Sequence, residues 1–222
     1  LAWLEFRRVL FRSAFSLCIK RKDWVSINFS FYFLTNLLVL IISWTLVTTI
    51  SIPSSTKGLV YTNLNTVISI VELFTYVSFF RHFTNKIIYR YFLLTPFLVF
   101  LAFQMLFLLT RLSFITTRYR YVFSILNVFE FLMLITWALI YFYKLFNTKS
   151  SLELFKRPSF WIVTGIFTFS VISTPFYLLN PLLFDLKAET RATLGIFLFQ
   201  LPIILNSSLL IKGLLCREKL TT

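Results

Sequence analysis

The feature that most constrains this chain is its succession of long apolar runs, separated by short segments that hold most of the charged residues. A helix needs roughly 20 apolar residues to cross a bilayer. Six runs reach or approach that length: residues 24–50, 64–80, 91–110, 121–143, 158–179 and 192–215. The sequence therefore predicts an all-α fold, a polytopic transmembrane helix bundle with six complete spans.

Composition supports the same class. Of 222 residues, 58% are hydrophobic and 14% are charged, and the mean hydropathy is +0.83, whereas soluble domains are nearer half apolar and a quarter charged. A formal charge of +14 would indicate nucleic acid in a soluble protein, but here the Lys and Arg residues sit mainly at the ends of the apolar runs, as the positive-inside rule expects. We therefore expect a lipid bilayer as partner and no nucleic acid.

The distribution of basic residues also predicts the topology. They gather before the first run and after the second, fourth and sixth runs, and such ends face the cytoplasm. Loops 51–63 and 180–191 are then outside, and the C-terminus is cytoplasmic. Arg111, with Arg118 and Arg120, falls on the outer side, so these arginines either count against the assignment or have a role there.

Two acids stand inside apolar runs, Glu72 in residues 63–80 and Glu130 in residues 121–143. A carboxylate at such depth is expensive and is functional by default. Both runs go from outside to inside, and each acid lies about nine residues, or roughly 13 Å, below the outer end. The two acids could share a proton, pair with an arginine or coordinate a cation. The alternative is that each only hydrogen-bonds to Ser, Thr or Tyr and fixes helix packing.

Other polar residues are secondary candidates. Arg111 is the nearest basic partner for the acids by depth, and Gln104 lies in the middle of the third run. Gln104, Asn36, Gln200 and Asn206 are the residue types that hydrogen-bond between membrane helices. The many Phe and Tyr residues are expected to face lipid or the interface.

Metal, cofactor and catalytic signals are weak. Cys18 and Cys216 are far apart, and His82 is the only histidine, so neither a disulfide framework nor a metal site is indicated. The chain shows neither a glycine-rich phosphate loop nor a GxSxG motif. We expect no cofactor and no enzymatic activity. His82 is expected at a solvated helix end, with pH sensing as the alternative.

The first residues are expected to be foreign. Residues 4–13 read LEFRRVLFRS, which is the translation of a common short-read sequencing adapter, and the chain opens with Leu1. We therefore expect residues 1–13 to be a non-native sequencing artefact and residues 14–219 to form the transmembrane helical domain.

Three stretches carry a family resemblance: TNLNTVISIVELFTY, NVFEFLMLITWALIYFYKLF and LELFKRPSFWIVTGIFTF. The third is the most distinctive, because Pro158, Phe160 and Trp161 open a membrane helix. Residues 14–219 resemble a family of small bacterial seven-helix membrane proteins, which also form the membrane sensor region of histidine kinases. The resemblance implies an inner (cytoplasmic) membrane location and one more helix, of which AFSLCI at 14–19 would be the stump. It matches Glu72 and Glu130 to the family's membrane acids.

Two functions remain open at this stage. One is an integral membrane sensor or signalling module, whose polar site around the two glutamates acts on a cytoplasmic kinase, a regulator or a lost domain. The other is a small transporter or channel that uses the same acids as proton or cation sites. The chain has four glycines and no evident inverted repeat, and both features are unlike transporters with broken helices.

Overall fold

The computed structural model describes residues 24–48, 54–109, 117–148, 154–183 and 201–216. Its elements are α2 (Trp24–Thr48), α3 (Ser54–Arg81), α4 (Lys86–Ile88), the π-helix η1 (Tyr89–Leu94), α5 (Thr95–Leu109), α6 (Thr117–Thr148), α8 (Pro158–Leu183) and α10 (Leu201–Leu215). These ranges contain helices and no strand, so the all-α prediction is confirmed for the described part of the chain. The expectations for residues 1–13, for the stump at 14–19 and for Arg111 lie outside it.

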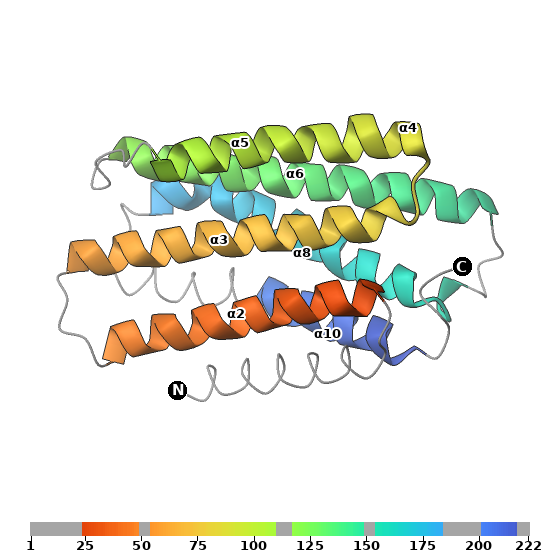
Figure 1. Cartoon of the computed structure of the whole chain (residues 1–222), viewed down its shortest axis with the longest axis horizontal. Coiled ribbons are helices and arrows are strands. Elements are labelled where there is room, and N and C mark those ends of the chain that lie inside the picture. Colours follow the sequence, from red (N-terminus) through yellow and green to blue (C-terminus); the bar gives the residue numbers. More distant parts are fainter. Residues whose placement is uncertain (1–23, 49–53, 110–116, 149–153, 184–200, 217–222) are drawn as a thin grey trace.

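The helices lie side by side along a common axis, and consecutive helices alternate in direction (Figure 1). α4, η1 and α5 follow one another without a break and form one rod. α8 packs along both α6 and α10, while α3 contacts α2, α5 and α6. α3 and α6 run in the same direction, as the sequence predicted for the two runs that carry the acids.

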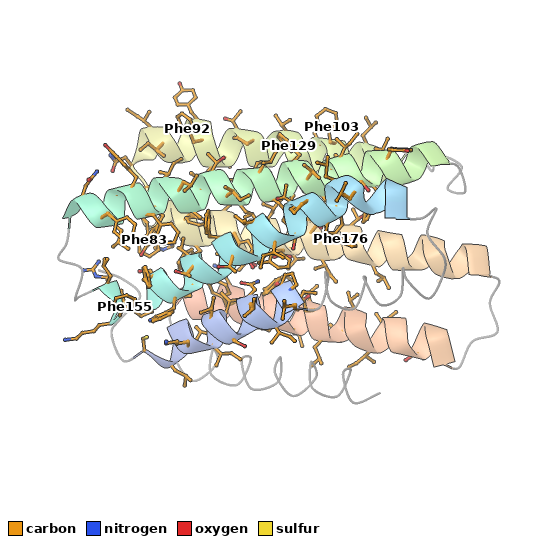
Figure 2. The ribbon with its side chains drawn as sticks, turned by 180° about the vertical axis from the view of Figure 1, so that it is seen from behind. Phe83, Phe92, Phe103, Phe129, Phe155 and Phe176 are labelled. Carbon is orange, nitrogen blue, oxygen red and sulfur yellow. The ribbon has the colours of Figure 1, made fainter. Side chains whose placement is uncertain are left out.

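The bundle buries polar side chains and exposes apolar ones. Glu72, Gln104, Asn127, Glu130 and Asn206 are all buried. Large apolar side chains, in contrast, are exposed along the helices, and Phe92 and Phe103 point away from the bundle (Figure 2). The exposed set includes Phe31, Leu38, Phe74, Leu98, Leu106, Ile125, Leu132, Leu139, Leu178 and Leu205. Soluble monomers rarely expose apolar surface on this scale.

Within the described residues, two helices are long and apolar enough, by length and composition alone, to cross a membrane, over Tyr121–Asn147 and Pro158–Leu179. Three shorter apolar helices lie at Ile27–Val39, Tyr91–Leu106 and Leu201–Leu215.

The predicted outer loop at 51–63 is wrong from Ser54 onward, because α3 begins there. The error arose because hydropathy marks the apolar length of a helix and not its full length. Glu72 is consequently eighteen residues from the start of its helix, and not nine from a loop.

Two other helices, α6 and α8, are also longer than predicted. α6 extends beyond the run at 121–143 at both ends. α8 continues through Pro175 to Leu183. The described part of the last run starts at Leu201, and residues 192–200 lie outside it.

Pro96 explains a hydrogen bond that fixes α6 to the neighbouring rod. Proline has no N–H and therefore cannot donate to the carbonyl four residues earlier, which belongs to Phe92. The indole Nε1 of Trp137 on α6 donates to this carbonyl at 2.7 Å. The π-helix η1 lies just before Pro96, and helices commonly depart from α geometry where the ladder is interrupted. Trp137 thus supplies the donor that the proline removes.

Two glycines allow α8 and α10 to approach closely. A Cβ atom at Gly213 would lie 2.7 Å from Ile162 Cγ1 and 2.9 Å from the Pro158 carbonyl oxygen. A Cβ at Gly165 would lie 3.0 Å from Asn206 Oδ1. Small residues at such contacts are typical of membrane helix packing. Gly165 and Gly213 therefore serve helix contact in unbroken helices.

An aromatic layer crosses the bundle from α2 to α6. We define it as Phe29, Phe79, Phe80, Phe83, Trp137 and Tyr141. Its rings contact in series, with centroids 5.8 Å apart for Phe29 and Phe79 and 6.0 Å apart for Phe80 and Trp137. All but Phe83 are buried. The expectation that the aromatic residues face lipid or the interface is therefore wrong for this group, because close ring packing fills the core.

The Pro96–Trp137 relationship gives a test of this packing. Replacing Trp137 by Phe removes the donor to the Phe92 carbonyl, and should lower the free energy of unfolding by about 1 kcal/mol. In a Pro96→Ala background the backbone regains an N–H that can donate to the Phe92 carbonyl. Trp137→Phe should then lower the free energy of unfolding clearly less than it does in the wild-type background. Denaturant unfolding of the four variants measures the difference.

Trp161→Phe is the matched control, because the Trp161 indole donates to the Phe155 carbonyl at 2.8 Å, away from Pro96. Its cost should be the same in both backgrounds. An equal cost of Trp137→Phe with and without Pro96 would contradict the explanation.

Candidate functional site

One face of α3 carries the first part of the site. Ser69, Glu72 and Tyr76 follow one another at three- and four-residue spacing, which places them on one side of a helix. Glu72 and Tyr76 are buried, with exposed fractions of 7% and 0%. The Tyr76 hydroxyl hydrogen-bonds to the Glu72 carboxyl group, so the carboxyl is held by a side chain of its own helix.

α6 brings the second acid to the same place. Glu130 is 1% exposed, and its carboxyl group is close enough to Glu72 for direct electrostatic interaction. The Ser69 hydroxyl hydrogen-bonds to Glu130. α3 therefore contributes both a neighbouring acid and a hydroxyl to Glu130, and the two carboxyl groups form a pair across the α3–α6 interface.

Tyr76 links this pair to two further helices. Asn206 Nδ2 on α10 donates to the Tyr76 hydroxyl at 3.4 Å, and the Tyr32 hydroxyl on α2 shares a hydrogen bond with it. The rings of Tyr32 and Tyr76 also contact, with centroids 6.0 Å apart. One hydroxyl therefore joins α2, α3 and α10 beside the carboxyl pair.

The polar atoms of the site outnumber their partners. Glu72 Oε1, Glu130 Oε2 and Asn206 Oδ1 are buried and have no hydrogen-bond partner among the described residues. Most buried polar side-chain atoms in proteins do have partners. Two negative charges placed together away from water repel each other and lose hydration, and a single shared proton removes most of that cost. The arrangement is thus suited to holding a proton on one of the two carboxyl groups.

The Lys and Arg residues whose side chains the structure describes lie far along the bundle from this pair, and the side chains of Arg118 and Arg120 at the start of α6 lie outside that description. The last turns of α3, α6 and α10 and the first turns of α4 and α8 meet at one end, on the right of Figure 1, which we call the basic end. Its described cations are Arg81, Lys144, Lys156, Arg157 and Lys212. The described buried residues include no Lys, Arg or His. A salt bridge therefore does not neutralise the pair within the described part.

The remaining predicted residues are distributed as follows. Gln104 lies on α5, is 1% exposed, and has its Oε1 without a partner; among the described residues no hydrogen bond joins it to either acid. Arg111 lies outside the described residues, so its predicted pairing with the acids stays a prediction. Asn206, expected to hydrogen-bond between helices, does so to Tyr76, whereas Asn36 donates within its own helix to the Tyr32 carbonyl at 3.0 Å.

The predicted helix-start motif opens α8 at the basic end. Pro158 is the first residue of α8. Phe160 packs edge-on against Phe155 with centroids 5.4 Å apart, and Lys212 Nζ of α10 lies 3.4 Å from the Trp161 ring centroid. Figure 2 shows Phe155 and Phe83 at this same end. The motif therefore joins α8 to α10 and lies apart from the carboxyl pair.

Sequence reasoning did not single out Ser69, Tyr76 or Tyr32. A usable signal existed for the first two, because a hydroxyl three residues before Glu72 and another four residues after it share its helix face. Tyr32 had no such signal, since its contact with Tyr76 depends on how α2 packs. No cluster of three or more His, Cys, Asp or Glu that would hold a metal occurs within the described ranges.

Comparison of the chain with protein-family models, with curated proteins and with solved structures finds no match.

The carboxyl pair makes a spectroscopic prediction. If the two acids share a proton, the infrared spectrum at neutral pH should contain the carbonyl stretch of a protonated carboxylic acid. Exchange into heavy water should shift this band. The Glu72→Gln/Glu130→Gln variant should lack it, because an amide keeps the shape of the acid and removes the proton site.

Glu153→Gln is a suitable control, because that acid falls in the polar segment before α8, and it should leave the band unchanged. A spectrum without any protonated-acid band, or a band that survives the double replacement, would overturn the shared proton.

Proposed function

We propose that this chain is a multi-pass integral membrane protein in which all six helical rods cross the bilayer. Support comes from the reversed distribution of polarity, with glutamates and amides buried and Phe, Leu and Ile exposed. In a bilayer, exposed apolar side chains contact lipid, and polar groups turn inward. The two helices that are long and apolar enough to span add to this.

The basic end faces the cytoplasm in this proposal. Five described Lys and Arg side chains gather there at the ends of four helices, namely Arg81, Lys144, Lys156, Arg157 and Lys212. Short cytoplasmic segments carry such an excess of basic residues. Lys144 Nζ donates to the Phe83 carbonyl at 2.8 Å, so one cation also ties the ends of α3 and α6 together. The carboxyl pair then lies deeper in the bundle, toward the outer side.

In this proposal the bundle acts as a sensor or signalling module. The main support is that the carboxyl pair is connected to four helices. Glu72 and Tyr76 belong to α3, Glu130 to α6, Tyr32 to α2 and Asn206 to α10. A change of charge at the pair alters hydrogen bonds on all of these helices. Local electrostatic changes of this kind are how ligand switches bias a packed structure between two arrangements.

The transporter alternative fits the structure less well. The aromatic layer lies between the carboxyl pair and the basic end, and its rings are closely packed from α2 to α6. The described glycines lie in unbroken helices, whereas transporters of the broken-helix class interrupt their helices at the site. A path through the whole bundle would require the aromatic layer to open.

The resemblance to the bacterial seven-helix family extends this proposal. It implies an inner-membrane location, and a cytoplasmic kinase or regulator as the partner of the sensor. The basic end, where α10 and α8 meet through Lys212 and Trp161, is the surface on which such a partner would act.

A flux measurement separates the two functions. We expect proteoliposomes that contain the purified chain to hold an imposed proton or Na⁺ gradient as well as protein-free liposomes do, because the aromatic layer closes the bundle. A pH-sensitive dye inside the vesicles, or radioactive Na⁺, measures the leak.

Glu72→Gln/Glu130→Gln in the same vesicles is the control. A flux that the wild-type chain carries and this variant does not would establish a transporter and refute the sensor.

A further inference from the structure

Buried polar side chains on both α3 and α6 lead from the carboxyl pair toward the end of the bundle where these helices begin. Toward the basic end, α3 buries the hydroxyl residues Thr75 and Ser78 before the aromatic layer begins. Thr66 and Ser69 precede Glu72 on α3, and Ser124 and Asn127 precede Glu130 on α6, in each case at three-residue spacing. All except Ser69 are buried, and Ser69 is half-buried. Because the two helices are parallel, these residues form a polar stripe toward the end of the bundle where α3 and α6 begin.

The stripe contains unpartnered groups as well as satisfied ones. Ser124 Oγ is buried and has no hydrogen-bond partner among the described residues. Asn127 Nδ2 donates to the Phe123 carbonyl at 2.7 Å. Hydroxyl and amide groups in a row are what a proton needs to move between ordered waters. On the other side of the pair, Thr75 Oγ1 donates to the Val71 carbonyl of its own helix at 2.8 Å. Beyond it, the aromatic layer presents ring faces and the partnered polar groups of Trp137 and Tyr141.

We propose that the Glu72–Glu130 pair is a proton-binding site loaded from the end of the bundle where α3 and α6 begin, and that Tyr76 transmits its charge state to α10. This inference rests on the sensor function proposed above and names its stimulus, the acidity on the outer side of the membrane. One proton leaves outside water and binds a carboxylate oxygen, so the charge of the pair changes by one.

The proton is preferred over a metal cation because of the number of available ligands. Cations of the Ca²⁺ or Mg²⁺ class need six or more oxygen ligands. The described residues supply two unpartnered carboxylate oxygens at the pair, and Asn206 Oδ1 faces Gly165 on α8. A proton needs only one acceptor oxygen.

The other ionisable groups packed around the pair are tyrosines, within the part of the chain that the structure describes. Tyr32 and Tyr76 bond to the site, Tyr141 donates to Ser159 Oγ at 2.7 Å, and Tyr177 of α8 packs on Phe131. α5 offers the neutral Gln104 and α10 the neutral Asn206. His82 is the chain's only histidine and lies exposed at the basic end. The contributions of the carboxyl pair and of His82 to a pH response are therefore separable by mutation.

Transmission follows from the hydrogen bonds of Tyr76. When Glu72 is charged, the Tyr76 hydroxyl donates to a carboxylate, and such charge-assisted bonds are roughly twice as strong as neutral ones. When the carboxyl group is neutral, that bond weakens and the hydroxyl is released to turn toward Tyr32 or Asn206. Asn206 is the residue through which α10 contacts this network, so the rearranged hydrogen bonds alter the position of α10. Lys212 lies near the basic end of α10, and Cys216 directly follows the helix.

Cys216 provides a reporter for this movement. The other cysteine, Cys18, is replaced by Ser, so that an environment-sensitive fluorophore attaches only at Cys216. The labelled full chain is reconstituted into liposomes, and a membrane-impermeant quencher shows on which side the label lies. The pH is then changed on one side of the membrane at a time, at constant Na⁺ concentration.

We expect the fluorescence to change when the side opposite the label is acidified, and to stay constant when the label's side is acidified. Glu72→Gln/Glu130→Gln should lose the response, and His82→Gln, the matched control, should keep it. Tyr76→Phe should keep the protonated-acid infrared band and lose the fluorescence response, because only the link to α10 is removed.

A response that His82→Gln abolishes, a response to acid on the label's side, or a response to Na⁺ at constant pH would each overturn the inference. So would a Tyr76→Phe variant that responds like the wild type. The gradient measurement above tests the sensor function separately. If the vesicles hold their gradients and the fluorescence at Cys216 does not respond to pH, the proton is not the stimulus, and the sensor proposal stands. If the vesicles leak and the double replacement removes the leak, the sensor proposal itself is rejected.

Discussion

The structure depends on the burial of two neighbouring carboxyl groups in an otherwise apolar bundle. A buried charge without a partner costs several kcal/mol, so Glu72 and Glu130 require hydroxyl and amide groups around them. Ser69 and Tyr76 on α3 supply hydroxyls, and Tyr32 and Asn206 extend the network to α2 and α10. The same requirement fixes how four helices are rotated about their axes, since each must turn its polar residue inward.

Between this network and the basic end, the bundle contains a closely packed aromatic core. The contacts from Phe29 through Phe80 to Trp137 and Tyr141 join α2, α3 and α6, and Tyr141 reaches Ser159 at the start of α8. A rigid layer of this kind lets a small rearrangement at the carboxyl pair be passed on to helix positions at the basic end, because packed cores deform little. Sensing at one depth and reporting at another is therefore compatible with the architecture.

Much of the fold followed from hydropathy and charge, while the details of the site did not. The runs at 121–143 and 158–179 correspond to α6 and α8, because the length of an apolar run can be counted directly from the sequence. The start of α3 at Ser54 was missed, since polar residues continue a helix without any hydropathy signal. The partners Tyr32 and Asn206 depend on helix rotation and neighbour choice, which a single sequence does not encode in a local pattern. Arg111 lies outside the described residues, and its role stays a prediction.

The central claim is that Glu72 and Glu130 face each other across the α3–α6 interface, and cross-linking tests it most directly. Both are replaced by Cys in a chain whose Cys18 and Cys216 are Ser, and a protease site is introduced at Ser113 so that cleavage separates α3 from α6. After oxidation with a membrane-permeant oxidant, the account predicts that the two fragments stay joined until a reductant is added. The pair Phe74→Cys and Leu132→Cys, whose native side chains are 50% and 49% exposed, should separate on cleavage. Fragments joined by the outward pair and not by the inward pair would contradict the account.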